Sequence, residues 1–123
     1  MESFVFLAMV YMHIIDDYFL QGILAQLKTK AWWEKNEPDP KYKNDYLTAL
    51  TMHSLSWAFS IMLPLAIYYG FDISTSPFAL FFFANAAIHY TVDDLKANKR
   101  IINLRTDQMF HMLQICITFR CLI

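Results

Sequence analysis

Four long apolar segments alternate with polar ones along the 123-residue chain. Each segment is close to the roughly 20 residues that a helix needs to cross about 30 Å of hydrocarbon. The pattern therefore predicts one all-α domain over residues 1–123, a membrane-embedded up-down four-helix bundle. The expected spans are residues 4–27, 46–69, 77–95 and 107–123.

Polar residues interrupt every one of these predicted spans. A helix exposed to lipid on all sides would not tolerate them, whereas a bundle can turn them inward. A soluble ferritin-like bundle would need polar outer faces, which segments such as PFALFFFANAA and WAFSIMLPLAIYY lack. The composition agrees, because 57% of the residues are hydrophobic and 17% are aromatic, above the usual apolar share of a soluble domain.

The basic residues predict how the bundle is oriented. Lysine and arginine cluster between the first and second spans and between the third and fourth, whereas the loop GFDISTS has none. The positive-inside rule places both basic loops in the cytoplasm and both termini outside. The net charge of -1 gives no reason to expect nucleic acid. Cys116 and Cys121 are expected to be small buried hydrophobes rather than a disulfide or a metal site.

Three of the predicted helices repeat one pair of side chains, a histidine and an aspartate four residues apart. Such residues share one face of a helix. The second helix adds a histidine of its own. A rise of 1.5 Å per residue places the other histidines about 10 Å from the cytoplasmic helix ends and the first pair nearer mid-membrane, so that all can converge on one layer between the bilayer centre and the cytoplasmic leaflet. These residues are His13, Asp17, His53, His89, Asp93, Asp107 and His111.

Imidazole and carboxylate groups are ligands of first-row transition metals, and helix bundles build metal sites from facing helices. We therefore predict a divalent transition metal, with zinc favoured. Seven side chains exceed the four ligands of one tetrahedral zinc, so they suit either two ions or one ion with outer carboxylates. A proton relay and structural pairs that set helix register are the alternatives.

Three neighbouring residues are candidates for catalytic roles. Lys96 lies at the cytoplasmic mouth of the layer, where it would contact an anionic group such as a phosphate. Asp16 and Asp94 each adjoin a histidine–aspartate pair without belonging to it. A carboxylate that does not bind the metal could serve as general base.

Three motifs carry a family resemblance that spans nearly the whole chain. HIIDDYFLQ resembles an H-x-x-x-D-F-x-L-Q signature, HYTVDDLK an H-x-x-x-D-x-x-K element and DQMFH a D-Q-x-x-H element of an uncharacterised family of small bacterial and phage multi-pass membrane proteins. That family is similar to predicted inner-membrane metal-dependent hydrolases. The chain departs from it in having Tyr18 where phenylalanine is usual and a single histidine in the second helix. The resemblance points to His13, Asp17, Gln21, His53, His89, Asp93, Lys96, Asp107, Gln108 and His111.

The sequence thus leads to two main functional hypotheses. The first is a metal-dependent hydrolase of the bacterial inner membrane, or of the host membrane if the chain is phage-encoded, which acts on a membrane lipid or phosphoester with an anionic headgroup. The second is a non-catalytic protein with a structural His/Asp core, such as a phage exclusion or lysis-regulating factor or an assembly subunit. A homo-oligomer or a membrane partner fits either hypothesis. An ion or proton conduit ranks last, because few polar groups continue toward the outer face.

Overall fold

A computed structural model describes residues 1–73 and 75–123, and no β-strand occurs in this part of the chain. The all-α prediction is therefore confirmed. The long helices are α1 (Glu2–Ile15), which continues into the π-helical turn η1 (Asp16–Leu20), α4 (Asp45–Tyr68), α5 (Thr75–Ala97) and α6 (Leu104–Leu122). The short elements are α2 (Leu24–Leu27), α3 (Lys30–Asn36) and the 3-10 turn η2 (Pro40–Tyr42).

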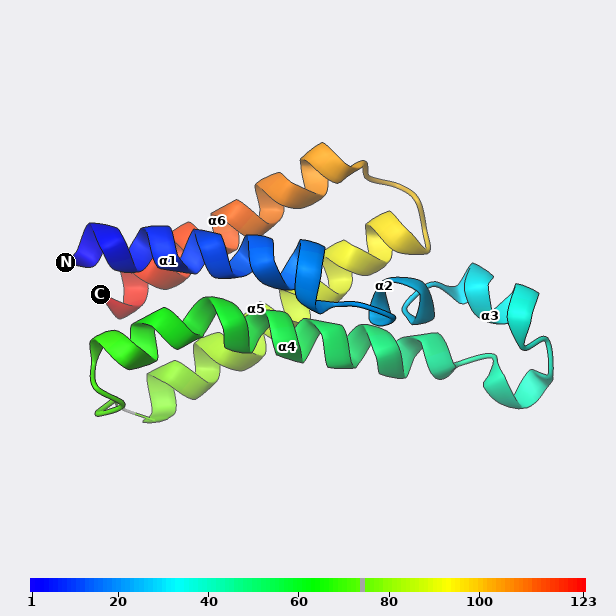
Figure 1. Ribbon diagram of the computed structural model, residues 1–123, viewed down its shortest axis with the longest axis horizontal. Coiled ribbons are helices and arrows are strands. Elements are labelled where there is room, and N and C mark those ends of the chain that lie inside the picture. The colour runs from blue at the N-terminus through cyan, green and yellow to red at the C-terminus, as the bar shows by residue number, and fades with distance from the viewer. Residues whose placement is uncertain (74) are drawn as a thin grey trace.

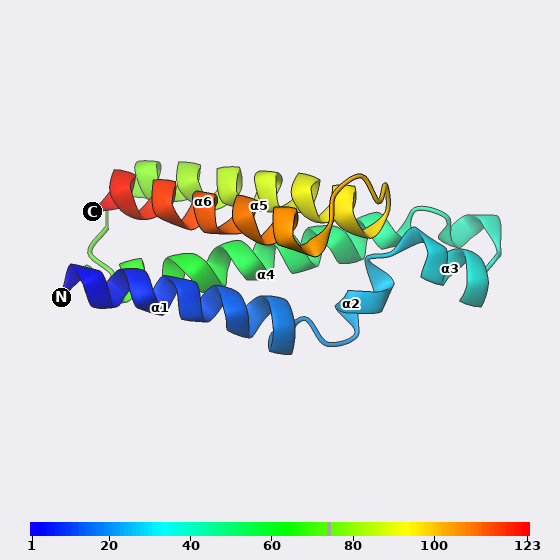
Figure 2. The same cartoon turned by 90° about the horizontal axis from the view of Figure 1, so that it is seen from above.

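The four long helices form an elongated bundle (Figures 1 and 2). α4 contacts both α1 and α5, and α6 packs against α5 and α1. Both termini lie at one end of the bundle, while α2 and α3 project from the other end (Figure 1). This arrangement is that of an up-down bundle of four long helices.

Two segments of the described chain are long and apolar enough to cross a membrane, judged by length and composition: Glu2–Leu20 and Pro40–Tyr68. Large hydrophobic side chains also cover much of the outer surface. Examples are Phe4, Leu7, Phe59, Leu80, Phe83 and Leu113, each more than half exposed.

The first helix is not continuous over residues 4–27, as the sequence had suggested. The Gln21 N–H bonds to the Asp16 carbonyl, five residues back, at 3.1 Å, which closes the wide π-helical turn. Gly22 then adopts a left-handed φ of 53°, a conformation that costs glycine little. The chain turns here, so that Lys28 at the end of α2 lies against α5.

The fourth helix begins three residues before its predicted start. The side chain of Asn103 accepts a hydrogen bond from the Thr106 N–H at 2.9 Å and caps α6. The extra turn places Asp107 and Gln108 inside the helix, with their side chains fixed by the helical backbone.

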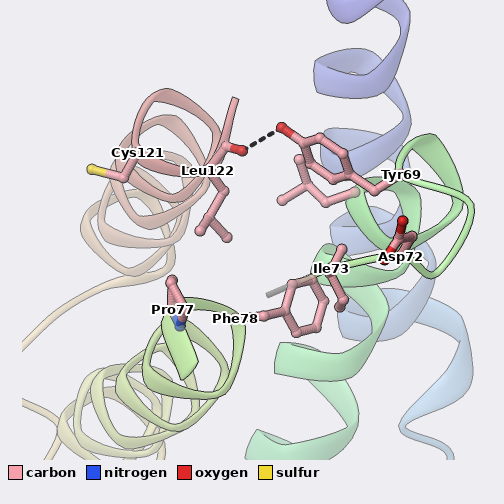
Figure 3. Close-up of a pocket in the computed structure, with 8 residues that line it drawn as sticks. Tyr69, Asp72, Ile73, Pro77, Phe78, Cys121 and Leu122 are labelled. Atoms are coloured by element: carbon pink, nitrogen blue, oxygen red, sulfur yellow. Dashed lines mark hydrogen bonds between the residues drawn. The ribbon is translucent and has the colours of Figure 1, made fainter. Parts of the chain in front are cut away.

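An apolar core fills the half of the bundle near the termini. Its buried residues come from α1, α4 and α6: Val5, Met9, Trp57, Ile61, Met62, Leu65 and Ile115. Beside it is a cavity of about 280 Å³ between the ends of α4, α5 and α6, where the Tyr69 hydroxyl donates to the Leu122 carbonyl at 2.6 Å (Figure 3). Cys116 is half-buried and Cys121 is exposed, and both are free thiols. The expectation of burial is wrong for Cys121, which is exposed near the C-terminal end of α6, and holds only in part for Cys116.

Candidate metal centre

The other half of the bundle encloses a polar layer, which draws residues from η1, α1, α2, α4, α5 and α6. All seven predicted metal ligands lie in it, and each is at most 7% exposed. We use the name polar layer for His13, Asp16, Asp17, Lys28, His53, His89, Asp93, Lys96, Asp107, Gln108 and His111. The sequence-based expectation that these distant segments converge therefore agrees with the structure.

Three ligand atoms meet at one point of this layer, from η1, α4 and α5. The Nε2 atoms of His53 and His89 lie 3.1 Å apart, and Asp17 Oδ1 lies 3.3 Å from the first and 3.9 Å from the second. Ligands bound to a tetrahedral ion at about 2.0–2.1 Å lie about 3.3 Å from one another. The first group, Asp17, His53 and His89, is close to this spacing and could hold a metal ion.

A second group of possible ligands consists of Asp17, Asp107 and His111. The Gln114 amide donates to the Asn85 carbonyl at 3.1 Å, so its oxygen is left to accept from His111 Nδ1 at 3.2 Å. The proton of neutral His111 is therefore on Nδ1. Its Nε2 presents a lone pair to Asp107 Oδ1 at 3.3 Å. Two acceptors at this distance are unfavourable unless a metal cation or a proton lies between them.

Asp17 belongs to both groups. Its Oδ1 is the oxygen nearest His53 and His89, while its Oδ2 accepts a hydrogen bond from Gln108 Nε2 at 3.2 Å. A carboxylate that borders two ligand groups can bridge two ions. The geometry therefore suits a pair of metal ions as well as a single ion.

Six buried side-chain atoms in residues 1–73 and 75–123 have no hydrogen-bond partner, and all six belong to the polar layer. A buried polar atom without a partner costs about 1–3 kcal/mol. The concentration of these atoms in one place indicates a site for ions or ordered polar ligands. The atoms are Asp16 Oδ1, His53 Nδ1, His89 Nδ1, Asp93 Oδ1, Asp107 Oδ1 and His111 Nε2.

The charge of the polar layer points the same way. It contains four buried carboxylates but only two ammonium groups, those of Lys28 and Lys96. With neutral imidazoles, two negative charges are in excess, and an unpaired buried charge costs several kcal/mol. One divalent cation would balance this excess, and a second would attract an anion.

His13 lies outside both ligand groups, although the sequence predicts it as a ligand. Trp57 Nε1 donates to its Nδ1 at 2.9 Å, so its Nε2 carries the proton and donates to Gln108 Oε1 at 2.9 Å. The Gln108 amide in turn donates to Asp17 at 3.2 Å and Asp107 at 2.9 Å. In this arrangement His13 orients the carboxylates through Gln108.

Asp16 has the geometry of an orienting residue. Its Oδ2 accepts hydrogen bonds from the hydroxyls of Ser56 and Ser60, both at 2.8 Å. Its Oδ1 faces His53 Nδ1 at 3.9 Å, which is longer than a hydrogen bond. An outer carboxylate on the far side of a ligating imidazole directs the other ring nitrogen toward the metal.

Asp93 borders the first group without being part of it. Its Oδ2 lies 3.6 Å from His53 Nε2 and accepts from Lys28 Nζ at 2.7 Å, and its Oδ1 lies 3.2 Å from Lys96 Nζ. Lys96 also donates to Asp107 at 3.0 Å, and its side chain is 25% exposed.

Asp94 belongs to a separate hydrogen-bond network at the end of α5. It accepts from Asn98 Nδ2 at 2.8 Å and lies 3.6 Å from Lys99 Nζ. Asn98 also binds the Lys28 carbonyl and the Lys30 N–H, so these residues secure the connection between α2 and α3. Asp94 is outside both ligand groups.

Two residues of the site were not singled out from the sequence. Lys28 looks like one of several loop lysines, and only the turn at Gly22 brings it, buried, to Asp93. Trp57 reads as an ordinary apolar residue, yet its ring stacks on His89 at a centroid distance of 4.3 Å. The spacing of Trp57 four residues after His53 is the one signal that could have placed it on the same face.

Comparison of the chain with protein-family models, with curated proteins and with solved structures gave no match.

Proposed function

We propose that the chain is a membrane-embedded, metal-dependent hydrolase. In this proposal α1 with η1, α4, α5 and α6 each cross the membrane, the polar layer lies toward the cytoplasmic leaflet, and both termini are outside. The observation that carries the proposal is the pair of ligand groups joined by Asp17 and buried in an apolar bundle. Polar groups inside a membrane protein usually mark a functional site.

The two ligand groups suit zinc or a similar divalent ion. An ion bound there would polarise an ester or phosphoester and would lower the pKa of a coordinated water. Lys96, the most accessible charged group of the layer, would bind the anionic part of the substrate. Asp93 is the carboxylate best placed to transfer a proton, because it adjoins the first group without belonging to it.

A second candidate function is a structural metal core in a non-catalytic membrane protein. Full burial favours it, because His53, His89, Asp107 and His111 are all 0% exposed. A structural site is closed, whereas a catalytic site keeps one coordination position open to substrate.

Counting metal ions in single variants tests the proposal. Protein purified in detergent and loaded with zinc is expected to bind two ions per chain. His53→Ala should remove the ion of the first group only, His111→Ala that of the second group only, and Asp17→Asn both. Elemental analysis gives the ratio of metal to protein.

Tyr69→Phe is the control, because it removes the hydrogen bond to the Leu122 carbonyl at the opposite end of the bundle. It should keep the full metal content. Absence of metal from the wild type, or full retention in Asp17→Asn, would contradict the proposal.

An activity measurement separates the two candidate functions. Zinc-loaded protein in vesicles of anionic phospholipid is expected to release hydrolysis products detectable by mass spectrometry, and Asp17→Asn should release none. Full metal content with no product, together with very slow loss of metal to a chelator, would favour the structural core.

A further inference from the structure

A groove between α1 and α6 reaches the polar layer from the side of the bundle. Its volume is about 500 Å³, and its walls include Val10, Ile14, Phe19 and Met112. α6 diverges from α1 toward its own N-terminus, where this groove lies (Figure 1). The groove is therefore largely apolar along its walls. It opens on the side of the bundle, next to the candidate span Glu2–Leu20.

Two residues of the polar layer reach this groove. His13 and Gln108 line it, and they are joined by a hydrogen bond of 2.9 Å. The Gln108 amide binds Asp17, the carboxylate shared by both ligand groups, and Asp107 of the second group. A single side chain thus connects the groove to the ligands.

We propose that this groove is the lateral entry for the substrate, and that the substrate is an anionic membrane lipid. The acyl chain would occupy the apolar walls, and the phosphate would pass Gln108 to reach Asp17 and Lys96. This inference rests on the proposed function and names the substrate class of the same site.

Charge and exposure support a lipid as the occupant. Lys96 donates to the same Asp107 carboxylate that accepts from Gln108, so a cationic group lies two hydrogen bonds from the groove. Phe19 is 74% exposed and Ile14 is 40% exposed, on a segment apolar enough to cross a membrane. Each methylene transferred from water to such walls contributes about 0.8 kcal/mol.

A second apolar cavity provides an internal comparison. It lies between α1 and α4, has a volume of about 660 Å³ and is lined by residues such as Phe4, Leu63 and Ile67. None of the described polar-layer residues lines it. A lipid chain in this cavity would not bring its phosphate to the metal centre.

Phosphorus NMR with a paramagnetic ion tests the entry route. Protein loaded with Mn²⁺ in detergent is mixed with short-chain phosphatidylglycerol, and broadening of the phosphorus signal reports phosphate close to the ion. Ile14→Trp fills the α1–α6 groove from a partly exposed position, and Ile67→Trp fills the other cavity as the matched control. Inorganic phosphate is the second probe, because it has no acyl chain.

The phosphorus signal of the lipid should broaden strongly with the wild type and with Ile67→Trp. It should bind about tenfold more weakly to Ile14→Trp, the factor expected when two methylenes lose their contacts. Inorganic phosphate should bind all three proteins equally. If Ile14→Trp fails to fold, Val10→Phe serves as a milder groove variant. It should also weaken binding of the lipid.

The outcomes separate the two proposals. Failure of the wild type to bind Mn²⁺ would overturn the metal centre and the entry route together. Bound Mn²⁺ with equal lipid broadening in the groove variants and the control would overturn the entry route alone. An equal loss of lipid and inorganic phosphate in Ile14→Trp would also overturn it, since the groove would then not act through the acyl chain.

Discussion

The apolar core and the polar layer are built from the same long helices, but their buried atoms differ in how completely their neighbours satisfy them. In the core, Met9, Ile61, Leu65 and Ile115 are 0% exposed and their aliphatic surfaces fill the space between them. In the layer the histidines and aspartates are at most 7% exposed, yet six of their polar atoms have no hydrogen-bond partner among the described residues. Buried apolar atoms need only close contact, whereas buried polar atoms also require hydrogen-bond or ionic partners.

Trp57 lies at the boundary of these two regions. Its ring belongs to the apolar core, while its Nε1 donates to His13 and its face stacks on His89. Packing in the core is thereby coupled to the orientation of the polar layer. Substitutions in each region should separate the two contributions.

The largest expected effect is that of Lys28→Met. Removing this ammonium group leaves the buried carboxylate of Asp93 without its 2.7 Å partner, and loss of one member of a buried ion pair costs about 3–5 kcal/mol. Thermal unfolding in detergent measures the loss. Lys30→Met is the control, because Lys30 is 56% exposed and should change stability little.

Leu65→Ala should destabilise the opposite half of the bundle by about 3 kcal/mol. Leu65 is fully buried in the apolar core, so its truncation leaves a cavity. Zinc content should stay at the wild-type value, because Leu65 touches neither ligand group. A parallel loss of zinc would show that the two regions fold as one inseparable unit.

Trp57→Phe should cost about 1 kcal/mol. The substitution keeps an aromatic ring in the core but removes the hydrogen bond to His13. We expect zinc affinity, measured by competition with a chelator, to fall several-fold because His13 then orients Gln108 less well. Unchanged affinity would mean that His13 and Gln108 do not position the ligands.

The smallest effect should be that of Asp94→Asn. Asp94 contacts Asn98 and Lys99 near the surface, so stability should change by about 0.5 kcal/mol or less. Zinc content and any hydrolytic activity should be retained, whereas Asp93→Asn should lower activity strongly. An equal loss of hydrolytic activity in Asp94→Asn and Asp93→Asn would favour Asp94 as a catalytic residue.

Regular spacing made much of this arrangement predictable. Histidine and aspartate four residues apart must share a helix face, and the lengths of the apolar segments place the four faces at one depth. The π-helical turn and the left-handed Gly22 were not predictable from periodicity, because they are local departures from it. The burial of Lys28 against Asp93 and the position of Asp16 behind His53 depend on that turn, and they emerged only from the structure.

The π-helical turn of η1 also has a consequence for how relatives of this chain would align. It widens the helix where two consecutive aspartates both face the interior, Asp16 toward the α4 serines and Asp17 toward the histidines of α4 and α5. If one residue were deleted here, the segment would form an ordinary α-helix. The residues on one side of the deletion would then be rotated by about 100° about the helix axis relative to those on the other side. Alignment gaps should therefore be tolerated in the α3 connection but not between Ile15 and Gln21, and a shortened relative should have lost one of the two aspartates.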